Sequence, residues 1–260
     1  PQFRVRDWQC TPPEDCQNMT DTKVALVVGA GDATGSAIAR RFAKEGFIAC
    51  VARRNGDQLT PLVERIEAEG GRAVPFGCDC RKEDLVIDLV ETIERDIGPI
   101  EVAVHNIGGN VHFPITETTA RVYFKVWEMG CFSGFLTGRE VAKRMLQRQR
   151  GTILFTGATA SMRGGAGFAG FAGAKHGLRA LAQSMARELG PEGIHVAHVV
   201  IDGAIDTKWI EKMFPDRYAL KDRDGILNPD MIAENYWSLH CQPRSAWTHE
   251  LDLRPWIESW

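Results

Sequence analysis

Short apolar runs alternate with longer amphipathic stretches along this chain, and the alternation limits the folds that the chain can adopt. Runs rich in β-branched residues favour strands, whereas the stretches between them have helical spacing. Strands are expected at Lys23–Gly29, Phe47–Ala52, Arg72–Cys78, Ile100–His105, Thr152–Thr156, Ile194–Val200 and, with a weaker pattern, Thr248–Leu253. The first six are almost continuously apolar, which is typical of parallel strands that helices cover on both faces.

The stretches between these runs predict crossover helices. They are expected at Ala37–Glu45, Gly56–Gly70, Arg81–Ile97, Thr118–Arg148 and Ala174–Gly190. A right-handed repeat of strand, helix and strand builds a doubly wound sheet, whose ligands bind beyond the carboxyl ends of the strands. The sequence therefore predicts an α/β fold: a single doubly wound Rossmann-type domain with a mostly parallel sheet of about seven strands and helices on both faces.

Length and charge are ordinary for one soluble domain. A chain of 260 residues can bury its own core without dividing into two domains. Its net charge of −3 gives no footprint for nucleic acid or an anionic membrane, and no apolar run could cross a bilayer. Residues 1–18 show no helical or strand period and no secretory signal, so we expect a poorly ordered leader or cloning remnant. The folded domain is expected over residues 19–260.

The cysteines do not form a metal-binding pattern. All seven are irregularly spaced, and no second ligand pair or histidine cluster completes a zinc set beside Cys78 and Cys80. We therefore expect no metal site, reduced thiols and a cytoplasmic location.

The first expected strand runs into a glycine-rich loop that opens a helix, from Gly29 through Asp32 and Thr34 to Gly35. Free backbone N–H groups and the positive end of the helix dipole can bind a pyrophosphate there. Glycine is needed where a Cβ would block the turn or the approach of the phosphate. A plain tight turn would also account for the glycines, but the position between strand and helix favours a dinucleotide.

The second expected strand ends at Arg53 and Arg54. An acidic residue about twenty residues after the loop would favour NAD, because it accepts hydrogen bonds from the adenosine ribose. Two guanidinium groups stand there instead, and guanidinium pairs well with a 2′-phosphate. The pattern favours NADP over NAD; a solvated basic pair is the alternative.

The loop and the positions that follow it resemble the short-chain dehydrogenase/reductase family, which usually reads T-G-x-x-x-G-x-G here. Gly29 and Gly35 keep the outer glycines, whereas Ala33 and Val28 replace the middle glycine and the threonine. The resemblance continues in family order over most of residues 22–207. It implies cofactor contacts from Gly29, Asp32, Thr34, Gly35, Arg53, Arg54, Asp79, Asn106, Lys175 and Thr207.

The family's catalytic pattern is only partly present. Its members use Tyr-x-x-x-Lys, with a serine thirteen residues before the tyrosine and an asparagine on an earlier helix. By this resemblance Lys175 keeps the lysine, whereas Phe171, Ala158 and Cys131 stand at the tyrosine, serine and asparagine positions. The chain is thus expected to be an atypical member in which Lys175 is the remaining catalytic residue; a surface lysine is the alternative. Replacement proton donors could come from Thr159, Ser161, His176 and Tyr123, each of which also suits packing or capping.

These patterns predict an atypical NADP-dependent oxidoreductase that transfers a hydride to or from a small organic substrate, at a carbonyl or alcohol or at an activated C=C bond. The alternative is a catalytically silent NADP-binding regulatory protein, and lyase chemistry is a weaker third. By family analogy residues 205–230 form a substrate lid, although an ordinary pair of surface helices would fit. The same analogy predicts a homodimer or homotetramer built on Thr118–Arg148 and Ala174–Gly190.

Overall fold

Seven strands form one sheet in the computed structural model, which describes residues 22–31 and 33–258. Their order is β3-β2-β1-β4-β5-β6-β7, and every neighbouring pair is parallel. The strands are β1 (Val24–Val28), β2 (Ile48–Arg53), β3 (Arg72–Gly77), β4 (Ile100–His105), β5 (Gly151–Thr156), β6 (Ile194–Ile201) and β7 (Glu250–Leu253). The order reverses between β1 and β4, so the predicted doubly wound Rossmann-type fold is confirmed.

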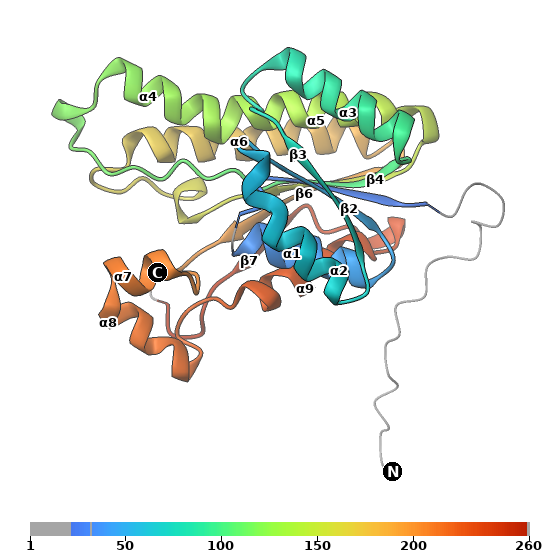
Figure 1. Cartoon of the computed structure of the whole chain (residues 1–260). Helices are drawn as coiled ribbons and strands as arrows, with labels where there is room; N and C mark the ends of the chain where they lie inside the picture. The colour runs from blue at the N-terminus through green and yellow to red at the C-terminus, as the bar shows by residue number, and fades with distance from the viewer. Residues whose placement is uncertain (1–21, 32, 259–260) are drawn as a thin grey trace, which may run out of the picture.

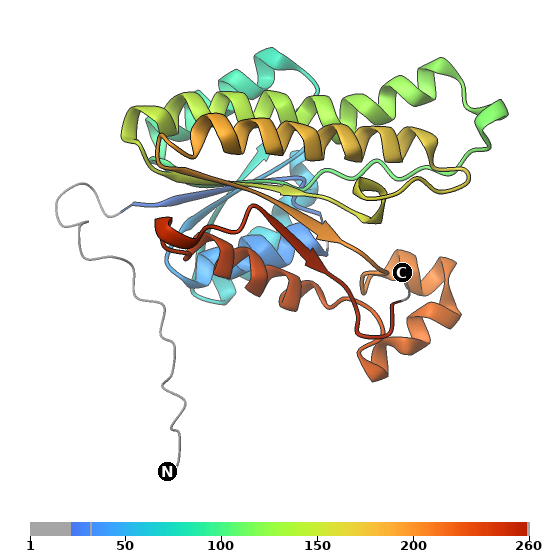
Figure 2. The ribbon, with the colours of Figure 1, turned by 180° about the vertical axis from the view of Figure 1, so that it is seen from behind.

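Helices cover both faces of this sheet (Figure 1). One face carries α1 (Thr34–Lys44), α2 (Thr60–Ala68) and α9 (Pro229–His240). The other carries α3 (Glu83–Asp96), α4 (Ala120–Trp127), α5 (Ser133–Arg148) and α6 (Ala169–Leu189), as Figure 2 shows from behind. Each layer closes over its own buried cluster of strand and helix side chains.

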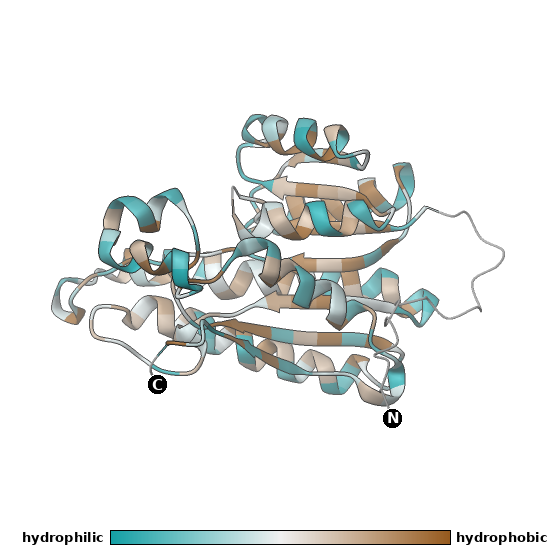
Figure 3. Cartoon of the chain, turned by 90° about the horizontal axis from the view of Figure 1, so that it is seen from below, coloured by the Kyte–Doolittle hydropathy of each residue, from teal (hydrophilic) through white to brown (hydrophobic). Residues whose placement is uncertain are grey.

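The apolar runs form strands because the central strands have no solvent-facing side. All residues of β1, β4 and β6 are buried, and in Figure 3 the strands are mostly brown whereas the helices carry both colours. Strand β3 is covered less completely, since its residues are all partly or fully exposed, although Val74 and Phe76 pack on one cluster and Ala73 on the other. That strand lies at the edge of the sheet, where Pro75 can lack an N–H without breaking a ladder.

Several helix boundaries differ from those expected. The predicted helix Thr118–Arg148 is interrupted, because a π-helical segment, η3 (Glu128–Phe132), joins α4 to α5. Helix α6 begins at Ala169 rather than Ala174, since its small residues and glycines hide the helical pattern. Helix α9 was not predicted. It packs on α1, where the rings of Phe42 and Trp237 lie 5.4 Å apart between centroids.

The predicted lid, residues 205–230, contains two short helices and a 3-10 turn. They are α7 (Lys208–Met213), α8 (Pro215–Tyr218) and η5 (Ala219–Arg223). The expected leader, residues 1–18, lies outside the described residues. Across the part of the chain that the structure describes, no helix combines the length and the apolar character needed to cross a bilayer.

Candidate active site at the carboxyl ends of the strands

The turn between β1 and α1 closes through direct backbone contact with the end of β4. Gly29 has a φ of +83°, and a Cβ there would lie 2.6 Å from the carbonyl oxygen of Asn106. A Cβ on Gly35 would lie 2.5 Å from the carbonyl oxygen of Gly29. The Asn106 side chain donates from Nδ2 to this same Gly29 oxygen at 3.1 Å, so it ties β4 to the loop as the resemblance implies. Gly29 and Gly35 are therefore required by the turn itself.

The N-terminus of α1 is open toward the end of the sheet. No described side chain caps it at Ala33, and its first turn contains no acidic residue. Gly31 lies before it, and a Cβ there would meet nothing within 4 Å. Thr34 begins the helix and is buried, whereas Asp32, a predicted contact residue, lies outside the described residues. Backbone amides and the helix dipole at such an end suit a phosphate.

Three arginines and one carboxylate gather beside this loop. Arg53 ends β2 and Arg54 follows it on the surface. Asp79 follows β3 and accepts hydrogen bonds from Arg81, at 2.8 Å from Nε and 2.6 Å from Nη2. These bonds, helped by the charge of Arg54, lower the pKa of Asp79 below its usual value. The group keeps a net positive charge, which suits an anionic ligand.

Lys175 lies inside the protein at the carboxyl ends of β4 and β5. It is only 3% exposed, and its Nζ donates to the carbonyl oxygens of Thr156 at 2.8 Å and Ile107 at 3.1 Å. Burial lowers the pKa of this ammonium to about 8. The ring of Phe171, one helical turn earlier, lies 5.9 Å from Nζ between centroid and atom. Lys175 is therefore not a surface lysine, which was the alternative interpretation of the sequence.

The π-helical segment places Cys131 near this cation. Burial raises the pKa of the Cys131 thiol, and the charge of Lys175 opposes the rise. A Cβ on Gly177 of α6 would lie 2.9 Å from the Cys131 sulfur, so the thiol packs directly on that helix.

The four residues considered as replacement proton donors lie in three places: two in the loop from β5 to α6, one on α6 and one on α4. Ser161 is fully buried and accepts from the backbone N–H of Ala158 at 3.1 Å. His176 is exposed, and Tyr123 lies against α6, where its hydroxyl would be 2.8 Å from a Cβ on Gly173. Thr159 instead donates from Oγ1 to the buried carboxylate of Asp202 at 2.5 Å. Asp202 is not recognisable as a site residue in the sequence, because only the pairing of β5 with β6 brings it beside Thr159.

The comparisons with known proteins decide the family. The profile of the family described as "short chain dehydrogenase" matches residues 23–217. This chain belongs to the short-chain dehydrogenase family. A short-chain dehydrogenase from Rhodopseudomonas palustris is 49% identical, with a TM-score of 0.77, over 90% of this chain and 99% of that one. Zerumbone synthase from Zingiber zerumbet is 31% identical over 202 residues, which cover 77% of this chain and 75% of that protein.

A third similar protein is a variant of actinorhodin polyketide ketoreductase, whose structure was solved with NADPH. It is 25% identical, with a TM-score of 0.81, over 90% of this chain and 97% of that one. The aligned segments span from 63% to 78% of the lengths of the curated relatives, the lowest being that of a short chain dehydrogenase from Pseudocercospora fijiensis.

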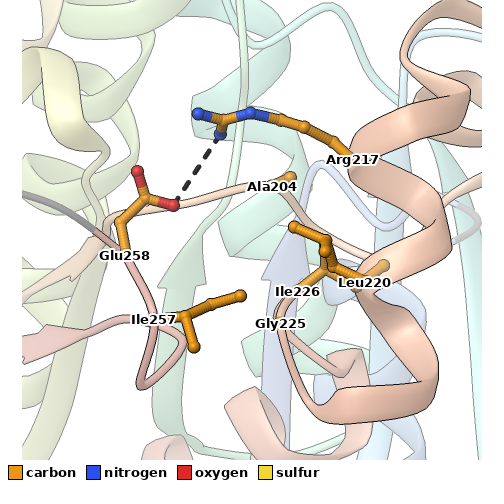
Figure 4. Close-up of a pocket in the computed structure, with 7 residues that line it drawn as sticks. All are labelled: Ala204, Arg217, Leu220, Gly225, Ile226, Ile257 and Glu258. Atoms are coloured by element: carbon orange, nitrogen blue, oxygen red, sulfur yellow. Dashed lines mark ion pairs between the residues drawn. The ribbon is translucent and has the colours of Figure 1, made fainter.

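Thr207 caps α7, the first helix of the segment predicted as a lid. Its Oγ1 accepts from the backbone N–H of Ile210 at 3.1 Å, so the contact with a cofactor stays a prediction. The segment predicted as a lid exposes large apolar side chains, namely Trp209, Met213 and Phe214. Figure 4 shows Arg217 reaching toward Glu258, 3.7 Å away, above Leu220, Ile226 and Ile257. The lid segment is thereby joined to the C-terminal strand region.

Proposed function

We propose that this chain is an NADP-dependent oxidoreductase that transfers a hydride to or from a small organic substrate. The observation that carries the proposal is the pairing of an open α1 N-terminus with Arg53 and Arg54 at the tip of the adjacent strand. The helix N-terminus suits a diphosphate, and the two guanidinium groups suit a 2′-phosphate. The structure of the related ketoreductase with NADPH supports the same choice.

The described residues fit such a nucleotide. Gly31 leaves open space in front of α1, where a diphosphate can approach the backbone. Asp79, Asn106 and Thr207 are proposed to contact its other parts, and the third N–H of Lys175 remains for a ribose hydroxyl after two carbonyl bonds. A bound nicotinamide nucleotide supplies the hydride chemistry that the side chains lack.

Calorimetry with the four nicotinamide nucleotides tests the cofactor assignment. Replacing Arg53 with alanine removes one charge-assisted contact, so NADPH affinity should fall about 10- to 100-fold while NADH affinity stays unchanged. Arg187→Ala, on the distant part of α6, is the matched control and should change neither. Equal losses for NADPH and NADH would refute the 2′-phosphate role, and no uptake of any nucleotide would refute the whole proposal.

A catalytically silent NADP-binding protein is the second candidate, and Phe171 favours it. A phenyl ring and the methyl group of Ala158 stand where the family resemblance implies hydroxyl groups, and neither can donate a proton. Loss of a general acid costs about 10²- to 10⁴-fold, so slow transfer remains compatible with the first proposal. Transfer of label from stereospecifically deuterated NADPH to ketones, quinones and enones separates the two. Tight binding without transfer to any of them supports the silent protein.

We also propose that the chain forms a homodimer or homotetramer in the cytoplasm. Phe124, Trp127, Phe132 and Phe135 form a row of stacked rings along α4 and α5, and Phe124 and Phe135 are exposed. A second copy would remove this row from water. Light scattering on wild type and a Phe124→Glu variant tests it: the variant should be the smaller species.

A further inference from the structure

Thr159 and Asp202 meet at the carboxyl ends of adjacent strands, on the same side as α6. Ala197, Val199 and Ile201 of β6 point into the cluster that α1 and α9 cover. Because side chains alternate along a strand, Asp202 turns to the opposite side, where Lys175 and Phe171 lie. Thr159 follows Ala158 directly in the loop after β5. The pair therefore lies beside the proposed reacting centre.

The contact between them is short and charge-assisted. Asp202 is 4% exposed, and the 2.5 Å separation between Thr159 Oγ1 and Asp202 Oδ1 is shorter than that of an ordinary hydroxyl bond. The guanidinium groups of Arg163 and Arg254 lie 3.8 Å and 4.0 Å from the carboxylate and compensate its charge. A buried carboxylate accepts and does not donate, so the shared proton belongs to Thr159.

This arrangement fixes what Thr159 can offer to a substrate. A hydroxyl has one proton and two acceptor sites, and here the proton is committed to Asp202. Thr159 is only partly buried, whereas Asp202 lies behind it. The hydroxyl oxygen can therefore accept a further hydrogen bond but not donate one. Ala158 and Phe171 beside it add no polar side-chain atom.

We propose that Thr159 and Asp202 form a proton relay that selects an alcohol substrate over the corresponding ketone. The substrate hydroxyl donates to Thr159 Oγ1, and as its O–H bond breaks, the Thr159 proton passes to Asp202 Oδ1. A bound oxidised nucleotide would supply the hydride acceptor: the carbon that bears the hydroxyl would lose a hydride, with both electrons of its C–H bond, and a C=O bond would form. Asp202 then releases the proton to solvent. The hydride step rests on the proposed function, whereas recognition of the hydroxyl does not.

Recognition is tested without turnover by fluorine NMR titration. The probes are 2,2,2-trifluoroethanol and its methyl ether, which keeps the acceptor oxygen but lacks the O–H donor. Wild type should bind the alcohol about tenfold more tightly than the ether, both without a nucleotide and with NADP⁺ added. Thr159→Val, which keeps the side-chain shape, should abolish this preference, and Thr159→Ser should restore it. Thr92→Val, on α3 far from the loop, is the matched control and should keep it.

The relay is tested by oxidation of 1-phenylethanol and cyclohexanol with NADP⁺. Asp202→Asn still accepts from Thr159 but is a poor base, so kcat should fall about 100-fold or more while KM changes little. Asp88→Asn, on the exposed side of α3, controls for the loss of one charge.

Equal binding of the alcohol and the ether by wild type overturns the proposal, whatever the turnover. So does a preference that survives Thr159→Val, or wild-type kcat in folded Asp202→Asn. Failure of the oxidoreductase proposal looks different: the alcohol is preferred and lost in Thr159→Val, but no alcohol is oxidised. Circular dichroism confirms that each variant is folded.

Discussion

Lys175 shows how one residue can be both costly and useful to this protein. Its ammonium is buried and is stabilised by two backbone carbonyl oxygens rather than by a carboxylate. Desolvation opposes the charged form, which is why the pKa falls to about 8 from 10.5. A cation maintained in this way near the reacting centre can orient a ribose or stabilise a developing anion.

The lowered pKa makes a prediction about stability. Between pH 10.5 and pH 8 the unfolded chain takes up the Lys175 proton before the folded chain does. The contribution of Lys175 to the free energy of unfolding therefore falls as the pH drops through this window, by about 3 kcal/mol, and is constant below it. Urea unfolding of wild type and Lys175→Met should show their stability difference changing between pH 8 and 10.5. A flat difference between the two proteins would contradict the buried charge.

The side chain of His198 leaves no room for a Cβ at Gly157. A Cβ at this position would lie 2.4 Å from Nε2 of His198, whose Nδ1 pairs with Glu250 at 3.1 Å. The imidazole is fully buried and cannot move aside easily. Gly157→Ala should lower the free energy of unfolding by about 1 to 3 kcal/mol, as overpacking does.

Gly164→Ala is the control, because a Cβ there meets nothing within 4 Å, and it should change stability by about 0.5 kcal/mol or less. Adding His198→Ala to Gly157→Ala should recover part of the loss. Simple additivity of the two changes would argue against the contact.

At the scale of elements, the β1–α1 turn contains glycines that the backbone geometry requires and one, Gly31, that it does not require. Gly29 combines a positive φ with a close approach to Asn106, whereas Gly31 faces open space. The two roles cannot be told apart in the sequence, where both are glycines of one loop.

Alanine substitution should separate them. Gly29→Ala should destabilise the fold by about 2 kcal/mol or more, because it adds strain and a backbone clash. Gly31→Ala should leave the unfolding midpoint unchanged and still weaken NADPH binding at least tenfold, since its methyl group occupies the phosphate approach. Thermal unfolding and calorimetry measure the two effects. Unchanged NADPH affinity in Gly31→Ala would place the diphosphate elsewhere.

At the scale of the whole molecule, the segment predicted as a lid contacts the C-terminal region. The indole Nε1 of Trp256 donates to the backbone oxygen of Arg223 at 3.0 Å, although the side chain is 76% exposed. Gly225 approaches Ile257 closely as well, because a Cβ there would lie 2.7 Å from it. The position of η5 therefore depends on residues about thirty positions later in the chain.

Removing the indole should loosen the lid without unfolding the domain. In Trp256→Phe, which keeps an aromatic ring, amide exchange across residues 208–223 should be about fivefold faster, as expected for the loss of one hydrogen bond. The exposed Met231→Ala on α9 serves as control. Exchange that is unchanged in the lid, or faster everywhere, would show that Trp256 does not hold this segment.

Much of the fold could be predicted from the sequence because strands buried on both faces leave continuous apolar runs. The edge strand β3 was placed correctly but its exposure was not, since burial depends on the order of strands. Helix α9 was missed because its helical period is weak. Lys175 and Asn106 lie in local motifs, so the sequence alone could propose them as site residues, and their contacts with a cofactor stay predictions. Asp202 could not be predicted, because it meets Thr159 only after the single crossover through α6 places β6 beside β5.

The packing of α9 on α1 has a consequence for how the protein is made. Phe42 is fully buried, and its ring contacts Trp237 and His240, almost two hundred residues later. A ribosome releases the first helix long before it releases the last one. The face of α1 around Phe42 therefore lacks its α9 cover through most of synthesis. We expect a chaperone to bind α1 during translation.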